Sequence, residues 1–123
     1  MQSTPPVTLV LGASEKPERY SNKAVKRLQA HGHSIMAVGA KSGNIGATRI
    51  EKQLPDQLNI DTVTLYLNPK RQAEYEEILL QLKPRRIIFN PGTENYSFAR
   101  EAENQGIEVI EACTLVLLSI GEY

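Results

Sequence analysis

The feature of this chain that most constrains its fold is a regular alternation of short apolar runs with stretches of helical spacing. Such an alternation forms a parallel sheet with helices on both faces, because each helix crosses over to begin the next parallel strand. We therefore expect an α/β fold with a Rossmann-like, doubly wound, five-stranded parallel sheet of order 3-2-1-4-5. Its strands are predicted over residues 7–12, 34–39, 61–67, 85–90 and 107–112.

The segments between these runs predict the helices. The first should begin near Ser21 or Asn22, which are good N-cap residues, and should end at Gly32. Pro69 suits the first position of a later helix, which Pro84 should end. The other segments are a weak helix over 50–58, a helix over 94–105 closed by Gly106, and a short, largely buried helix over 114–120.

The length and the charge of the chain limit the class of protein to which it can belong. The 123 residues are enough for one core, so residues 1–123 are predicted to form a single domain. Lys plus Arg and Asp plus Glu number 14 each, which argues against a nucleic-acid partner. No run approaches the roughly 18 apolar residues of a membrane span. Without a basic and apolar leader or paired cysteines, the chain is expected in the cytoplasm.

In a doubly wound sheet, ligands bind beyond the carboxyl ends of the strands, at the switch point, here expected between the first and fourth strands. The loop over 12–21 leads from the first strand to a helix N-terminus, which favours an anion. It lacks the dinucleotide fingerprint, because Ser14 and Pro17 replace the second and third glycines. We predict a phosphate site there, the alternative being an ordinary polar loop. The residues that would form it are Gly12, Ser14, Lys16, Arg19 and Ser21.

The ends of the next strands bear on the class of ligand. Lys41 stands where an NAD-binding domain usually has an acid, and it suits a phosphate on the ribose, as in NADP or coenzyme A. The alternative is an exposed loop lysine. Asn68 and Pro69 form a sharp turn that suits a rigid wall against a base or a pantetheine arm. Asn90 and Gly92 are predicted to line the cleft, or else to form a plain turn.

Catalytic and metal-binding groups are scarce. His31 and His33 follow the first helix and are expected at the amino end of the sheet, away from the ligand. Cys113 follows an apolar strand and is predicted to be a buried thiol with no histidine to activate it. These three residues also lack the spacing of a zinc site. We therefore expect neither a metal nor catalysis.

Several motifs follow one another in a characteristic order. They are VLGASEKPERYS, HGH, a lysine-bearing loop followed by IGATRI, LPDQLNID, and a strand ending in NP. Together they resemble the stand-alone CoA-binding domain family, which is related to the amino-terminal domain of the succinyl-CoA synthetase alpha subunit. The resemblance covers residues 6–113. It implies a Rossmann-like domain that holds coenzyme A across the carboxyl edge of the sheet.

Carried over by position, the resemblance assigns roles to individual residues. Gly12, Ala13 and Ser14 would meet the phosphate region, with Lys16, Arg19 and Ser21 beside them. Lys41 would approach the ribose phosphate or the pyrophosphate, and Asn68 with Pro69 would lie near the adenine. The chain has VGAK where the family commonly has VNPK, and NPGTEN where the family commonly has a leucine-glycine pair.

Three hypotheses remain open at this point. The first is a non-catalytic protein that binds coenzyme A or an acyl-CoA as a carrier, sensor or partner module. The second is an NADP-dependent oxidoreductase, which Lys41 would suit but for which 123 residues leave no substrate domain. The third is a regulatory or interaction module that keeps the fold without the ligand. The acyl group, the pathway, a protein partner and the oligomeric state are not determined by the sequence.

Overall fold

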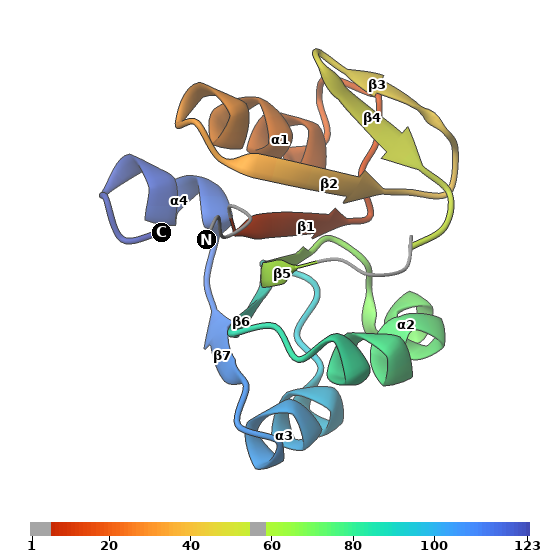
Figure 1. The fold of residues 1–123 in the computed structure, drawn as a ribbon, viewed down its shortest axis with the longest axis vertical. Coiled ribbons are helices and arrows are strands. Elements are labelled where there is room, and N and C mark those ends of the chain that lie inside the picture. Colours follow the sequence, from red (N-terminus) through yellow and green to blue (C-terminus); the bar gives the residue numbers. More distant parts are fainter. Residues whose placement is uncertain (1–5, 55–58) are drawn as a thin grey trace, which may run out of the picture.

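One twisted sheet forms the centre of the computed structural model, which describes residues 6–54 and 59–123 (Figure 1). Within these residues the sheet has seven strands in the order β3-β4-β2-β1-β5-β6-β7. The strands are β1 Val7–Leu11, β2 Ser34–Val38, β3 Gly43–Ile45, β4 Thr48–Glu51, β5 Ile60–Leu65, β6 Arg86–Phe89 and β7 Glu108–Glu111. The helices are α1 Tyr20–Ala30, α2 Pro69–Leu82, α3 Tyr96–Asn104 and α4 Thr114–Ser119.

The sheet is parallel except for β3, which pairs antiparallel with β4 at one edge. Numbered along the chain, the described parallel strands β4-β2-β1-β5-β6-β7 lie in the order 3-2-1-4-5-6, the order of a doubly wound sheet built from two halves. The predicted α/β class is confirmed, but the five-stranded sheet of order 3-2-1-4-5 is wrong. The strand predicted third along the chain is β5, and it lies beside β1 instead of beyond β2.

The cause of this error is a short hairpin, β3–β4, that occupies the position beyond β2. Its strands of 3 and 4 residues are too short to show a clear period, and part of the helix predicted over 50–58 is in fact β4. Gly46, with φ +58°, begins the two-residue turn between them. The side-chain amide of Gln29 in α1 donates to Ile45 O at 2.8 Å and holds the hairpin. Residues 55–58 of the predicted helix lie outside the described residues.

The remaining elements follow the sequence closely. The five predicted strands are present as β1, β2, β5, β6 and β7, and α2 begins at Pro69 as expected. Ser21 and Asn22 do not cap α1, because the helix begins at Tyr20 and its N-cap residue is Arg19. Both residues lie within the first turn of the helix and are buried. The amide of Asn22 instead donates to Ser14 O at 2.9 Å and fastens the preceding loop.

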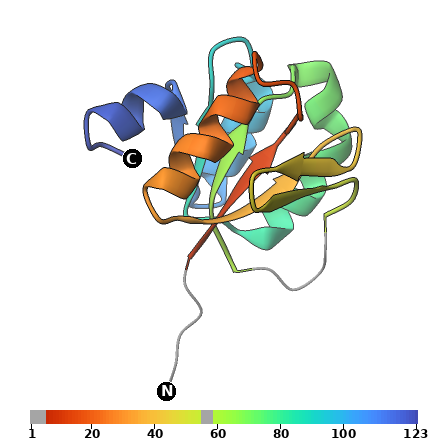
Figure 2. The same cartoon turned by 90° about the horizontal axis from the view of Figure 1, so that it is seen from above.

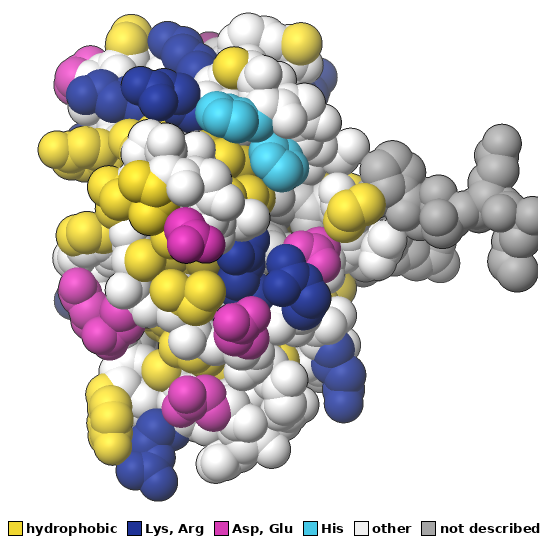
Figure 3. Space-filling view, turned by 90° about the vertical axis from the view of Figure 1, so that its left-hand side faces the viewer, with side chains coloured by type: hydrophobic (Ala, Val, Ile, Leu, Met, Phe, Trp, Pro, Cys, Tyr) yellow, Lys and Arg dark blue, Asp and Glu magenta, His cyan; other side chains and the backbone are white. Residues whose placement is uncertain are grey.

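Helices cover both faces of the sheet, as predicted (Figures 1 and 2). On one face, apolar side chains of α2 and α3 pack on those of β1, β5 and β6. On the other face, α1 and α4 pack on β1, β2 and the hairpin. The prediction that 114–120 is largely buried is wrong, since Val116 is 52% exposed and Ile120 is 62% exposed. Apolar side chains are visible on the face of the molecule that carries α4 (Figure 3).

Candidate ligand-binding cleft at the switch point

The strand order places a crevice between β1 and β5, because the chain leaves these neighbouring strands toward opposite faces of the sheet. This corrects the predicted switch point, since β6, the strand predicted fourth, does not neighbour β1. A cleft of about 710 Å³ lies at this edge. Loops after β1, β2, β5 and β6 form it, together with the first turns of α1 and α2. Its volume falls in the range of about 300 to 1,000 Å³ that is typical of small-molecule sites.

The start of the loop after β1 is fixed by backbone contacts. The N–H groups of Gly12 and Ala13 both donate to Val38 O, at 2.8 and 2.9 Å. Gly12 has φ +101°, and a Cβ there would lie 3.0 Å from the carbonyl carbon and oxygen of Tyr66. Glycine is therefore required at this position. Because both N–H groups already have an acceptor, a phosphate in the cleft must be bound by other donors.

Such donors lie at the N-terminus of α1. Arg19 is the N-cap residue, and no side chain accepts a hydrogen bond from the first turn of this described helix. The first-turn N–H groups are therefore left to solvent or to an anion, which the helix dipole also favours. Ser21 is only 4% exposed but still lines the cleft. Ser14 accepts a hydrogen bond from Lys16 N at 3.2 Å, which shapes the loop that leads to the helix.

Positive charge predominates in the lining. Lys16, Arg19, Lys41 and Arg71 line the cleft, against the single carboxylate of Glu15. Within the described part of the chain, ion pairs involve only Arg49 and Arg85 among the cations, so none of the cleft cations is paired. The Glu15 carboxylate accepts a hydrogen bond from Asn44 N at 2.9 Å and ties the loop to β3. The cleft is therefore suited to an anionic ligand.

The structure brings together most of the residues proposed from the sequence. Nine of the eleven line the cleft: Gly12, Ala13, Ser14, Lys16, Arg19, Ser21, Lys41, Asn68 and Gly92. Pro69 does not line it, because it is the exposed first residue of α2, whose N-cap is Asn68. Asn90 does not line it either and is 2% exposed.

Asn90 has a structural role instead. Its side-chain amide donates to Thr64 Oγ1 at 2.7 Å and to Leu65 O at 2.8 Å. Its side-chain oxygen accepts from Thr114 N at 2.8 Å. These bonds join the end of β6 to β5 and to the start of α4. The polar atoms of Asn90 are thus occupied within the fold and are not directed to a ligand.

Arg71 and Tyr66 were missed at the level of sequence. Arg71 is the third residue of α2 and lines the cleft, since α2 begins at the true switch point. The run of Asn, Pro, Lys and Arg at 68–71 indicates positive charge at the start of a helix, but the switch point was predicted at another pair of strands, so Arg71 was not assigned to the site. Burial raises the pKa of Tyr66 to about 12. Tyr66 therefore stays neutral at physiological pH and adds no negative charge to the cleft.

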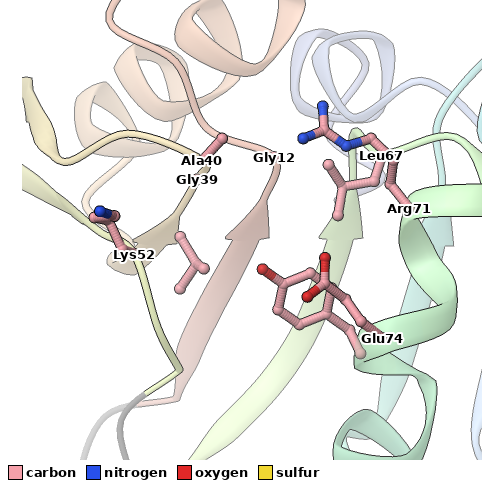
Figure 4. Close-up of a pocket in the computed structure, with 9 residues that line it drawn as sticks. Gly12, Gly39, Ala40, Lys52, Leu67, Arg71 and Glu74 are labelled. Atoms are coloured by element: carbon pink, nitrogen blue, oxygen red, sulfur yellow. The ribbon is translucent and has the colours of Figure 1, made fainter.

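A smaller cavity of about 130 Å³ adjoins the cleft (Figure 4). We call it the side cavity. It shares Gly12, Ala40, Leu67 and Arg71 with the cleft, and its other lining residues are Val38, Gly39, Lys52, Glu74 and Tyr75. It lies between the ends of β2 and β4 on one side and α2 on the other. Gly39 has no room for a side chain, because a Cβ would lie 2.2 Å from Ala13 O.

The histidines and the cysteine lie elsewhere. His31 and His33 precede β2 at the amino end of the sheet, and histidine side chains are visible at the surface in Figure 3. The ring of His33 packs edge-on against the ring of Tyr123, with the ring centroids 5.0 Å apart. Cys113 is half-buried at the N-cap of α4, so it is more accessible than expected. In residues 6–54 and 59–123, no three His, Cys, Asp or Glu side chains form a group that could hold a metal ion. None of the described helices has the length and apolar character to cross a membrane.

Comparisons with known proteins agree with this architecture. A family model described as a CoA binding domain matches residues 7–119. A crystal structure of an uncharacterized protein is 42% identical, with a TM-score of 0.92, over 98% of this chain and 100% of that one. A hypothetical protein from Pyrococcus horikoshii OT3 is 25% identical, with a TM-score of 0.79, over 94% of this chain and 95% of that one.

Part of a larger enzyme has the same fold. A dinucleotide-forming acetyl-coenzyme A synthetase 1 from Ca. Korarchaeum cryptofilum, in complex with phosphate and ADP, is 13% identical with a TM-score of 0.72. The alignment covers 88% of this chain and 26% of that one. No curated protein matches the chain.

Proposed function

This chain belongs to the CoA binding domain family, and we propose that it binds coenzyme A or an acyl-coenzyme A in the switch-point cleft without catalysing a reaction. Family membership supports the class of ligand. The observation that carries the assignment of the site is the convergence, in one cleft of about 710 Å³, of an uncapped helix N-terminus and four cations that form no ion pair with any described residue.

The charges of the cleft match those of the ligand. Coenzyme A carries a diphosphate and a phosphate on its ribose, so it needs two separate groups of donors. Lys16, Arg19 and the N-terminus of α1 form one group and are proposed to bind the diphosphate. Lys41 follows β2 and is proposed to bind the ribose phosphate.

The absence of turnover is part of the proposal. In the described residues, the cleft lining includes neither histidine nor cysteine, and its one carboxylate, Glu15, is held by Asn44 N. An acid–base pair or an activated nucleophile needs partners within hydrogen-bond reach of a reacting atom. The lining offers no such pair. A role in which the protein carries the ligand or responds to it fits this chemistry.

The experiment is isothermal titration calorimetry of the purified protein with coenzyme A, dephospho-coenzyme A, NADP and NAD. We expect coenzyme A to bind most tightly. Arg19→Ala should weaken coenzyme A binding by about 1 to 3 kcal/mol, the value of a charge-assisted hydrogen bond. Arg27→Ala is the matched control, because Arg27 is an exposed arginine in the last turn of the same helix and does not line the cleft.

Several results would contradict the proposal. Equal binding of NAD and coenzyme A would leave only a general nucleotide-binding site. An unchanged affinity in Arg19→Ala would remove Arg19 from the site. Steady turnover of an acyl-CoA or a nicotinamide substrate, lost in a cleft variant, would replace the non-catalytic assignment with an enzymatic one.

A further inference from the structure

The outward side of α4 is an apolar surface that the single chain leaves uncovered. The helix has the sequence TLVLLS, which is apolar on almost every side, and a helix of this kind is normally buried all round. Thr114 and Leu118 are buried within the fold, whereas Val116 is 52% exposed and Ile120 is 62% exposed. Val116 and Ile120 stand four positions apart and so lie on the same side of the helix. We call these two side chains the α4 ridge.

Basic side chains lie along one side of the ridge, on the neighbouring helix α1. The charged residues of this helix are Lys23, Lys26 and Arg27, all of them exposed. Gln29 faces the hairpin, to which it donates a hydrogen bond, and Arg27 stands two positions earlier, about 160° away around the helix. Arg27 and Lys23 therefore lie away from the hairpin, on the side where α1 contacts α4. We call these two residues the basic row.

Acidic side chains lie along the other side of the ridge, on β7. This strand is an edge of the described sheet, and its Glu108 and Glu111 are exposed. We call these two residues the acidic row. The guanidinium of Arg85 lies 3.7 Å from the Glu108 carboxylate but also 3.0 Å from that of Asp61, so one cation is shared by two carboxylates. Figure 3 shows this face, with Lys and Arg side chains at the top, hydrophobic side chains in the middle, and most of the acidic side chains, together with some basic ones, from the middle downward.

The charges of this face argue against two other ways of covering it. Antiparallel pairing of β7 with β7 of a second copy, over all four residues of EVIE, would place Glu108 opposite Glu111. Like charges directly opposite each other destabilise a sheet, and charged side chains on an edge strand prevent such pairing. A membrane surface of anionic lipids would attract the basic row but would repel the acidic row. The ridge therefore needs a partner that carries both signs of charge.

We propose that this face is the interface of a homodimer, whose two-fold axis runs along the α4 ridge in the plane of the interface. A rotation about this line keeps the position along the ridge and exchanges its two sides. The ridges of the two copies then pack on each other, and the basic row of each copy meets the acidic row of the other. An axis across the ridge would instead place basic row over basic row.

The arrangement has two consequences. The same patch serves both copies, so the contact closes at two copies and does not propagate into larger assemblies. Because position along the ridge is kept, the carboxyl edges of both sheets, and with them both clefts, lie at the same end of the dimer. The six residues of α4 span only about 9 Å, so the ridge alone is too small for a stable interface and the charged rows must contribute.

The first test measures the mass of the protein in solution by sedimentation velocity, from micromolar to millimolar concentrations. Wild type should change from the 13.7 kDa of one chain to twice that mass. Val116→Glu brings like charges from the two copies together near the axis and should weaken the dimer at least about tenfold. Ala73→Glu is the matched control, because Ala73 is an exposed apolar residue of α2 on the opposite face of the sheet, and it should leave the dimer unchanged.

The second test exchanges the charges of the two rows. One variant carries Lys23→Glu with Arg27→Glu, and the other carries Glu108→Lys with Glu111→Lys. All four positions are exposed, so both variants should fold, which circular dichroism verifies. Each variant alone should dimerise at least about tenfold more weakly than wild type, because both contacts then oppose like charges.

An equimolar mixture of the two variants should dimerise again, since each altered row meets a row of opposite charge. The control reverses two exposed charges of α2, Lys70→Glu with Glu77→Lys, and should behave as wild type. A loss of dimer through misfolding would not be restored by mixing. The mixture therefore reports on the contact between the rows.

Four results would overturn the inference. They are a wild type that stays at the mass of one chain at every concentration, a dimer that survives Val116→Glu, a mixture of the two variants that stays monomeric, and species larger than a dimer that grow with concentration. None of these measurements includes a ligand. Failure of the homodimer therefore leaves the proposed function standing, and failure of coenzyme A binding leaves the homodimer standing.

Discussion

Replacing Asn90 with alanine should destabilise the fold strongly and change ligand affinity little. The side chain is 2% exposed and makes three hydrogen bonds of 2.7 to 2.8 Å. The structure thus predicts a loss of stability, whereas a ligand contact at Asn90 would predict a loss of binding. The two explanations can be distinguished by measuring both quantities on one variant.

The size of the effect follows from the groups that lose their partner. In Asn90→Ala, Thr114 N–H and Leu65 C=O lose the bonds at 2.8 Å. The Thr64 hydroxyl keeps its hydrogen bond to Thr114 Oγ1 at 2.7 Å, so it contributes little to the loss of stability. Each buried group left unsatisfied costs about 1 to 3 kcal/mol, which gives a total of about 2 to 6 kcal/mol. This is a large part of the roughly 5 to 15 kcal/mol that stabilises an ordinary domain.

The assay is urea denaturation followed by far-ultraviolet circular dichroism, with the free energy of unfolding taken from the midpoint and slope. Asn44→Ala is the matched control, because Asn44 is exposed and its contact with Glu15 uses the backbone N–H. It should change stability by less than about 0.5 kcal/mol. Calorimetry on the folded fraction of Asn90→Ala should give a coenzyme A affinity within about threefold of wild type, since no ligand contact is lost. A stability loss below about 1 kcal/mol, or lost binding in a variant that remains folded, would refute this reasoning.

Three further predictions concern the cleft and the sheet. Lys41→Ala should abolish the preference for coenzyme A over dephospho-coenzyme A, with a coupling energy of about 0.5 to 3 kcal/mol measured by calorimetry. Added salt should weaken this preference in the wild type. A coupling energy near zero would mean that Lys41 is a solvated surface charge. Gly39→Ala should lower both the melting temperature and coenzyme A affinity, because its Cβ would lie 2.2 Å from Ala13 O and push the loop away; wild-type values for both would show that the loop gives way freely. The hydrogen bond from Arg85 holds the pKa of Asp61 below its ordinary value. The ionised Asp61 carboxylate therefore stabilises the fold at neutral pH, and this stabilisation is lost as the pH falls below about 3.9. Asp61→Asn should therefore lose part of the acid dependence of the urea midpoint between about pH 2 and 7, and an unchanged pH profile would count against this ion pair.

The sequence alone determined the elements whose signals are local. The strands β1, β5 and β6 are buried on both faces and are therefore read as short apolar runs. The strands β2 and β7 are less buried, but their short apolar runs between turn residues were also predicted as strands. The start of α2 was also local, because Pro69 suits the first helical position. Most of the cleft residues could be named as well, since the carboxyl ends of parallel strands meet at one edge whatever the strand order.

The tertiary structure alone decided the features that depend on contacts between distant residues. The hairpin β3–β4 is held by Gln29 from α1, and its place beyond β2 moved the switch point to β1 and β5. That order brought Arg71 into the cleft and, with Glu74, formed the side cavity. It also buried Asn90 against β5 and α4, 24 to 26 residues away along the chain. Local propensity carries no information about such pairings, because they form only when strands and helices have packed.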